Sequence, residues 1–102
     1  MSKLLSVIIV SYNTKDLTCQ TIASVLAEIE ASSLLKKQTE IFLVDNHSQD
    51  NSLLAVKKLF KDIKFADCYI ISNQKNLGFA QANNQAIDQA QGQYLFLLNS
   101  AG

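Results

Sequence analysis

Four continuous apolar segments are the feature of this 102-residue chain that most restricts its fold. They span residues 6–11, 40–45, 67–72 and 93–98 and are rich in Val, Ile, Leu, Phe and Tyr. Because their apolar residues are not separated by polar ones, they predict parallel strands that are covered on both faces rather than strands with one face in water. Parallel strands also require long crossover connections, which are usually helices.

The three stretches between these segments have the periodicity of amphipathic helices. Asn13 or Thr14 is a suitable cap for the first helix, the second begins at Asp50 or Ser52, and Gly92 ends the third. Strand and helix therefore alternate, which predicts an α/β fold: a Rossmann-like three-layer α/β/α arrangement with a mainly parallel four-stranded sheet. The inward positions are Leu17, Ile22, Val25, Leu26 and Ile29 in the first helix, Leu53, Val56, Leu59, Phe60 and Ile63 in the second, and Phe79, Ala82, Ala86, Ile87 and Ala90 in the third, with Lys57, Lys58 and Lys61 outside.

The composition argues against a nucleic-acid-binding protein and against a membrane-spanning one. Lysine and acidic residues number nine each and arginine is absent, so the chain lacks the positive field that nucleic acid requires. Apolar runs are far shorter than the roughly 20 residues of a membrane-spanning helix, and the N-terminus reads as a first strand rather than a signal peptide. Cys19 and Cys68 have no metal-binding spacing, and we interpret them as reduced core thiols of a cytoplasmic protein.

Ligands of parallel α/β sheets bind outside the carboxyl ends of the strands, so the informative loops are those that follow each strand. The first such loop, Ser11-Tyr12-Asn13, contains no glycine, which excludes the dinucleotide-binding fingerprint. No Gly-Lys-Ser or Gly-Lys-Thr triplet is present, which excludes a P-loop. All four loops are polar, short and rich in amide side chains.

Several side chains in these loops have two interpretations. Asp45, which ends the second strand, can accept hydrogen bonds from a sugar hydroxyl or a base N–H, or it can form a turn and cap with Ser48. Gly78 permits either a turn with positive φ or the close approach of a ligand to a helix N-terminus. Of the adjacent Asn83 and Asn84, we expect one to face the cleft and the other to face solvent.

Taken together, the motifs resemble those of family-2 glycosyltransferases, most closely the rhamnosyltransferase-like branch. The resemblance rests on residues 7–13 (VIIVSYN), 44–52 (VDNHSQDNS), 76–84 (NLGFAQANN) and 97–99 (LLN), and it covers nearly the whole chain in the right order. It implies a glycosyltransferase A-type fold whose N-terminal half binds a nucleotide-sugar, usually a UDP- or dTDP-sugar. It also implies a divalent metal, Mn²⁺ or Mg²⁺, on the diphosphate.

The same resemblance implies roles for individual residues. The loop of Ser11, Tyr12 and Asn13 would lie against the base and ribose, and Asp45 would accept a hydrogen bond from the pyrimidine N3–H. The remaining residues that would border the donor site are Asn76, Gly78, Phe79 and Asn83 or Asn84.

The chain departs from the family pattern at its end. The family continues its fourth strand into an acidic triplet that holds the metal, whereas this chain reads Asn99-Ser100-Ala101, without a carboxylate. The family then continues into the acceptor site and the catalytic base. We therefore expect a single truncated domain, residues 1–102, that has no catalytic or metal-binding residue of its own and is inactive alone. The alternative is a non-catalytic interaction or dimerisation module, because a half-domain leaves apolar surfaces that favour a homodimer or a missing C-terminal partner.

Overall fold

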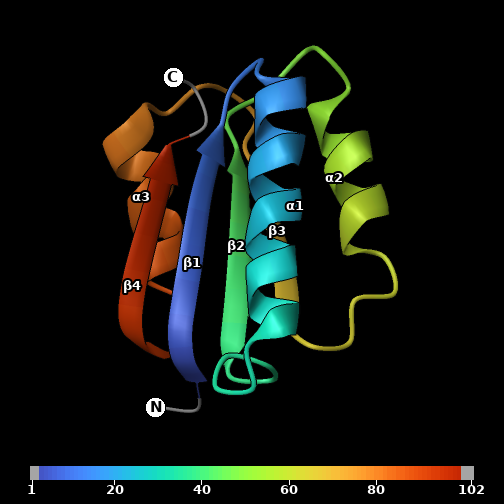
Figure 1. The fold of residues 1–102 in the computed structure, drawn as a ribbon. Helices are drawn as coiled ribbons and strands as arrows, with labels where there is room; N and C mark the ends of the chain where they lie inside the picture. Colours follow the sequence, from blue (N-terminus) through green and yellow to red (C-terminus); the bar gives the residue numbers. More distant parts are fainter. Residues whose placement is uncertain (1–2, 100–102) are drawn as a thin grey trace.

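The computed structural model describes residues 3–99, which form a four-stranded parallel sheet with helices on both faces (Figure 1). Strands and helices alternate along the chain, and the predicted fold class is confirmed. The elements are β1 (Lys3–Ser11), α1 (Lys15–Ala31), β2 (Thr39–Asp45), α2 (Ser52–Phe60), β3 (Asp67–Ser72), α3 (Phe79–Ile87) and β4 (Gly92–Asn99).

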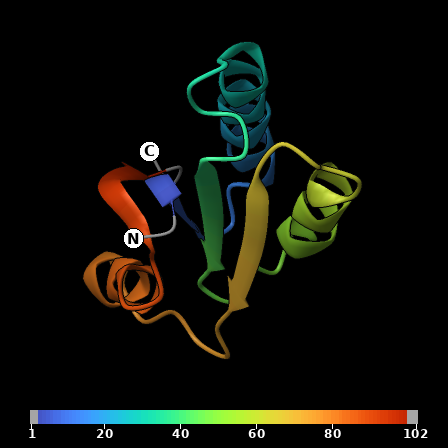
Figure 2. The same ribbon diagram turned by 90° about the horizontal axis from the view of Figure 1, so that it is seen from below.

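The strand order is β3-β2-β1-β4, and all three strand pairs are parallel. Helices α1 and α2 cover one face of the sheet and α3 covers the other, as the view along the strands shows (Figure 2). The chain first moves outward from β1 to β2 and β3, and α3 then returns it to the opposite side of β1. The strand order therefore reverses at β1, where ligands of open α/β sheets bind at the carboxyl edge.

Two layers of apolar side chains hold these elements together. Successive residues of β1 and β2 point to opposite faces, which is why both strands are continuously apolar and buried throughout most of their length. Beneath α1 and α2 the layer includes Val7, Ile9, Ile22, Leu26, Ile29, Ile41, Leu43 and Val56, and beneath α3 it consists of Ile8, Val10, Phe42, Val44, Ala82 and Ala86.

The prediction that all four strands are covered on both faces is wrong for β3 and β4. Both lie at sheet edges, and β4 leaves Tyr94 and Phe96 exposed on one face and Leu95 and Leu97 exposed on the other. An apolar run indicates that a strand is suited to burial. Whether the strand is buried depends on which other elements pack over it.

Two predicted inward positions are also wrong, for a shared reason. Leu17 and Phe79 are both exposed, since each lies in the first turn of a helix that begins near the carboxyl edge of the sheet, beyond the apolar layers (Figure 1). Gly92 does not end the third helix, which stops at Ile87. It is the first residue of β4. The outward positions of the three predicted lysines on and after α2 are confirmed.

Both cysteines are free thiols of intermediate burial rather than fully buried core residues. Cys68 packs against the apolar layer beneath α1 and α2. Its burial, and secondarily the charge of Asp67, raise the pKa of the Cys68 thiol to about 11.

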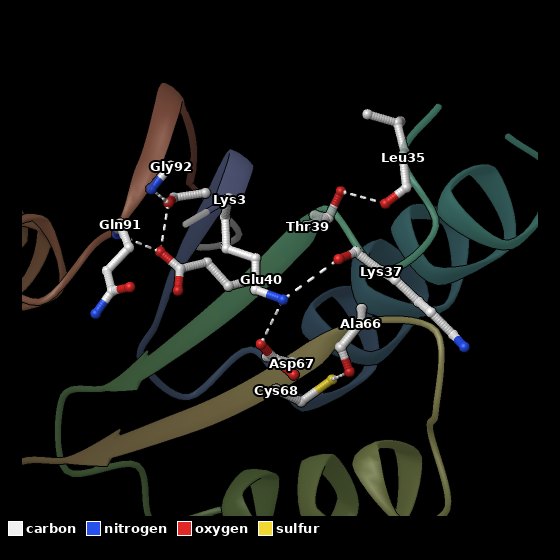
Figure 3. A network of polar contacts seen from close by, with 11 residues as sticks. Lys3, Leu35, Lys37, Thr39, Glu40, Ala66, Asp67, Cys68, Gln91 and Gly92 are labelled. Carbon is white, nitrogen blue, oxygen red and sulfur yellow. Dashed lines mark hydrogen bonds and ion pairs between the residues drawn. The ribbon is translucent and has the colours of Figure 1, made fainter. Parts of the chain in front are cut away.

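A polar network closes the amino edge of the sheet, opposite the loops of interest (Figure 3). The buried carboxylate of Glu40 accepts hydrogen bonds from the Ser6 hydroxyl and the Gln91 N–H, both at 2.6 Å. Ser6 Oγ in turn accepts from the Gly92 N–H at 2.8 Å, and Lys3 forms an ion pair with Asp67 at 2.9 Å. The contacts of Glu40 and Ser6 fix the start of β4 against β1 and β2, and the ion pair joins β1 to β3.

Candidate functional site

Three loops meet at the carboxyl edge of the sheet, at the top of Figure 1: residues 12–14 after β1, 46–51 after β2 and 73–78 after β3. Backbone hydrogen bonds connect the start of the second and of the third loop to the end of the neighbouring strand. The Asn46 N–H donates to the Ser11 carbonyl and the Asn73 N–H donates to the Asp45 carbonyl, each at 2.9 Å. The parallel register thus brings together loops that are distant in sequence. This convergence is what the sequence analysis anticipated.

Asp45 is the last residue of β2 and is only 2% exposed. Its Oδ2 accepts from the Ser48 N–H at 2.9 Å, and its Oδ1 accepts from the Ser48 hydroxyl at 2.6 Å. The turn and cap that formed one interpretation of Asp45 are therefore present. A carboxylate has about four acceptor positions, so these two bonds leave acceptor capacity for a further donor.

The loop after β1 is tied to the loop after β2 through Ser48 and Asn13. The Asn13 N–H donates to Ser48 Oγ at 2.9 Å, and Asn13 Oδ1 accepts from the Gln49 N–H at 2.7 Å. Tyr12 beside it is exposed, whereas the Ser11 side chain is buried and hydrogen bonded to Thr18 Oγ1 at 2.8 Å. Tyr12 and Asn13 therefore lie on the surface of this edge, and Ser11 serves the packing of α1.

The backbone of these two loops is bent at several non-glycine residues. Asn13, His47 and Asn51 have φ angles of 52°, 70° and 64°, in the left-handed region. Asparagine tolerates this conformation better than most residues, but each such position costs of order 1–3 kcal/mol, and they concentrate at binding sites. His47 is exposed.

A network of amides, which the sequence analysis did not identify, joins the loop after β3 to the loop after β2. Asn73 Nδ2 donates to Asn46 Oδ1 at 2.9 Å and to Gln85 Oε1 at 2.8 Å, and Gln85 Nε2 donates back to Asn73 Oδ1 at 2.8 Å. Asn46 Nδ2 donates to the Gly78 carbonyl at 3.2 Å. The start of α3 is thereby fixed to the end of β2.

Gly78 immediately precedes α3 and has a φ angle of 85°. The turn with positive φ is therefore observed, and no atom lies within 4 Å of where a Cβ would stand, so the backbone here is open. The Gly78 N–H donates to Asn76 Oδ1 at 2.8 Å. Asn76 and Phe79 are both exposed on either side of this glycine.

Asn83 and Asn84 differ in burial, since Asn84 is exposed and Asn83 is only 4% exposed, but that Asn83 faces the cleft stays a prediction. Asn83 Nδ2 donates to the Phe79 carbonyl at 3.2 Å. Asn83 Oδ1 is buried and has no hydrogen-bond partner within residues 3–99. A buried acceptor without a donor costs about 1–3 kcal/mol.

The carboxylates of this edge do not form a metal site. No group of three His, Cys, Asp or Glu side chains within residues 3–99 could hold a metal ion. Asp50 is used structurally, since it accepts from the Ser52 hydroxyl and from the Lys15 N–H at 3.0 Å. Burial alone would raise the pKa of Asp50, but these hydrogen bonds outweigh it and lower that pKa. Ser100 and Ala101, at which the resemblance led us to expect acidic residues, lie outside the described residues.

Comparisons with known proteins identify the family of this chain. Residues 6–100 match Glycosyl transferase family 2. A curated relative, the UDP-Glc:alpha-D-GlcNAc-diphosphoundecaprenol beta-1,3-glucosyltransferase WfaP of Escherichia coli, is 33% identical over 98 residues, covering 96% of this chain and 35% of that protein.

Two solved structures share the fold. The mannosyltransferase PcManGT from Pyrobaculum calidifontis, in complex with GDP-Man and Mn²⁺, gives a TM-score of 0.79 at 22% identity over 98% of this chain and 28% of that one. Residues 1–349 of S. aureus TarS, in complex with UDP, give a TM-score of 0.79 at 23% identity over 95% of this chain and 27% of that one. The chain spans about a third or less of the length of these relatives. It belongs to glycosyltransferase family 2 and corresponds to the N-terminal part of the glycosyltransferase A-type fold.

Proposed function

We propose that the carboxyl edge of this sheet is the donor-binding part of a family-2 glycosyltransferase and that it binds the nucleoside diphosphate of a UDP- or dTDP-sugar. The observation that carries this proposal is the convergence of the three loops after β1, β2 and β3, joined by the Asn13–Ser48–Asp45 and Asn46–Gly78 hydrogen bonds. The three loops are rich in amide side chains and contain a single lysine, Lys75, so this edge suits a nucleoside better than a free phosphate. WfaP, which uses UDP-Glc by its name, supports the choice of a uridine nucleotide.

Two buried acceptors give the proposed site a preference for ligand groups that donate a hydrogen bond. Asp45 retains acceptor capacity, and Asn83 Oδ1 has no partner in the described chain. Neither atom can donate to a phosphate oxygen, and both match the N3–H of uracil or thymine or the hydroxyl of a sugar. Tyr12, exposed at the end of β1, offers an aromatic face for the base.

The proposed activity of the isolated chain is binding without transfer. Glycosyl transfer needs stabilisation of the departing diphosphate and a base for the acceptor, each normally supplied by specific groups. The described residues do not fit a Mn²⁺ or Mg²⁺ site, although PcManGT was solved with Mn²⁺. The rhamnosyltransferase-like branch and a cytoplasmic location remain predictions. No helix within residues 3–99 is long and apolar enough to cross a bilayer.

A second function, an interaction module without nucleotide binding, is favoured by one observation. Both oxygens of Asp45 already accept hydrogen bonds from Ser48, and Ser11 is satisfied by Thr18. Much of this edge is therefore stable without a ligand, and it could persist as a purely structural feature.

Calorimetric titration separates the two functions. UDP and dTDP carry the N3–H donor, whereas CDP has the ribose and diphosphate of UDP but presents an acceptor at N3. We expect UDP and dTDP to bind about five- to a hundredfold more tightly than CDP, because one unmatched buried hydrogen bond is worth about 1–3 kcal/mol. Absence of heat with millimolar UDP would support the interaction module instead.

Variants locate the binding. Asp45→Asn should weaken UDP binding at least about tenfold, while Asp88→Asn, a change of the same kind on an exposed residue after α3, should leave it unaltered. Since Asp45→Asn also changes the bonds to Ser48, its fold is checked by circular dichroism. Asn83→Leu provides an independent test at the second acceptor. Equal UDP affinity in all three variants would contradict the proposed site.

A further inference from the structure

Asn46 is a buried residue that connects the ends of three strands to the start of a helix. It directly follows Asp45 at the end of β2 and is only 2% exposed. Its backbone N–H donates to the Ser11 carbonyl at the end of β1, at 2.9 Å. Its side-chain Oδ1 accepts from Asn73 Nδ2 at 2.9 Å, and its Nδ2 donates to the Gly78 carbonyl at 3.2 Å. Asn46 therefore contacts both strands that neighbour β2, or the loops that follow them.

The amides around Asn46 restrict its orientation. Asn73 is 8% exposed, and its Nδ2 donates both to Asn46 Oδ1 and to Gln85 Oε1. Asn73 Oδ1 in turn accepts from Gln85 Nε2 at 2.8 Å. A buried polar network whose members satisfy one another favours a single arrangement, because other arrangements leave a buried donor or acceptor unpaired.

The start of α3 depends on the amide of Asn46. Gly78 is the N-cap of α3 and has no side chain with which to cap the helix. Its carbonyl accepts the first helical hydrogen bond, from the Ala82 N–H at 3.2 Å, as well as the bond from Asn46 Nδ2. The Leu77 N–H donates to Asn46 Oδ1 at 3.4 Å. One side chain thereby holds both the cap of the helix and the residue before it.

The two buried acceptors of the proposed donor site belong to the two elements that Asn46 connects. Asp45 ends β2, directly before Asn46. Asn83 belongs to α3 and is bonded to its first turn, since Asn83 Nδ2 donates to the Phe79 carbonyl at 3.2 Å. A shift of the start of α3 would therefore move Asn83 Oδ1 relative to Asp45. A ligand that pairs with both acceptors binds less tightly when their separation is not fixed, because binding must then also order them.

We propose that Asn46 is a positioning residue that sets the separation of the Asp45 carboxylate and Asn83 Oδ1, and thereby the affinity for the nucleotide. The inference rests on the proposed function, because it requires both acceptors to face the same ligand. Both ends of the Asn46 amide are already occupied by protein groups. Asn46 therefore acts through Asp45 and Asn83 rather than through a ligand contact of its own.

Calorimetric titration with UDP tests the proposal on Asn46→Ala, which removes the amide and adds no charge. The apparent affinity falls by the fraction of molecules in which the site is correctly arranged. We expect α3 to be correctly placed in about a tenth to a third of the variant molecules, so UDP should bind about three- to tenfold more weakly.

Ser6→Ala is the matched control, because it removes another buried hydrogen-bonding side chain, at the amino edge of the sheet. It should bind UDP as tightly as the unmodified protein does. Both variants are titrated at a temperature at which circular dichroism shows them fully folded, so that a loss of stability alone does not lower the affinity.

A double-variant comparison separates positioning from a merely structural role. Asn83→Leu should cost a smaller fold-change in UDP affinity in the Asn46→Ala background than in the unmodified protein, because Asn83 is no longer held in place there. The two fold-changes should differ by a factor of about three or more. Should Asn46→Ala not fold, Gln85→Met removes a partner of Asn73 instead and should weaken UDP binding at least about twofold.

Three results would overturn this inference alone. They are equal UDP affinities of Asn46→Ala and Ser6→Ala, the same fold-change for Asn83→Leu in both backgrounds, and unaltered binding by Gln85→Met where Asn46→Ala does not fold. No binding of UDP by the unmodified protein would overturn the proposed function and, with it, this inference.

Discussion

Replacing Gly92 with alanine tests the contact on which the position of β4 depends. Gly92 begins β4 and lies against β1 so closely that an added Cβ would stand 2.4 Å from Ser6 Oγ, 2.5 Å from Ser6 N and 2.8 Å from the Leu5 carbonyl carbon. Two of these three atoms belong to the backbone of an internal strand and cannot rotate away. The start of β4 must therefore move outward.

The cost follows from the contacts that this movement breaks. The Gly92 and Gln91 N–H groups donate to Ser6 Oγ and to the buried Glu40 carboxylate, and a hydrogen bond to a charged group contributes about 1.5–3 kcal/mol. Overpacking costs about 1–3 kcal/mol more. Alanine offsets about 0.4–1 kcal/mol of this loss, because it lowers the conformational entropy of the unfolded chain. We expect a net loss of about 2–4 kcal/mol, a large part of the 5–15 kcal/mol typical of a domain.

Thermal and urea unfolding measure this loss. For a domain of this size, we expect the melting temperature of Gly92→Ala to fall by roughly 10–25 °C. Gly78→Ala is the control, because its φ of 85° costs about 1–2 kcal/mol but no atom lies within 4 Å of the new Cβ. Adding Ser6→Ala to Gly92→Ala should restore little, since the backbone contacts persist. A Gly92→Ala protein as stable as Gly78→Ala would refute the close packing of β4 on β1.

Three further predictions concern other parts of the molecule. Asn73→Ala removes the amide that serves both Asn46 and Gln85 and should cost about 2–3 kcal/mol of unfolding free energy; a loss below about 0.5 kcal/mol in urea unfolding would contradict the network. The raised pKa of Cys68, about 11, should slow its reaction with a thiol reagent at pH 8 by roughly a hundredfold relative to the unfolded chain, and equal rates would contradict its burial. Asp50 has a lowered folded-state pKa, so its contribution to stability is present above the unfolded value of about 3.9 and is lost as pH falls through the folded one. The unfolding free energy of Asp50→Asn should therefore fall less than that of the unmodified protein when the pH is lowered below about 4. The same pH dependence of the unfolding free energy in both proteins would contradict this role of Asp50.

The sequence predicted the order of elements because each strand and helix carries its own periodicity. It predicted the wrong environment for β4, since the burial of Phe96 depends on neighbours that its own segment does not encode. The exposure of Phe79 differs from the prediction for a similar reason, because the first turn of α3 has no apolar layer to contact.

The candidate site was predictable in part. That Asp45 lies at a strand end followed from the pattern, and the structure shows the turn with Ser48 that the same pattern allowed. The contact between Asn46 and Asn73 was not predictable, because it joins residues 27 positions apart in two irregular loops and leaves no periodic trace. The burial of Glu40 was not predictable from the sequence of β2 either. Its hydrogen-bond partners are Ser6 of β1 and Gln91, which precedes β4, and both are distant in sequence.

Mapping of amide chemical shifts during titration with UDP tests the central claim most directly. We predict that the shifts concentrate at the carboxyl edge, in Tyr12, Asn13, Ser48 and Gly78, and that CDP moves them far less at the same concentration. Shifts centred on the amino edge near Gly92, or equal responses to UDP and CDP, would contradict a site in which Asp45 recognises the N3–H of uracil or thymine.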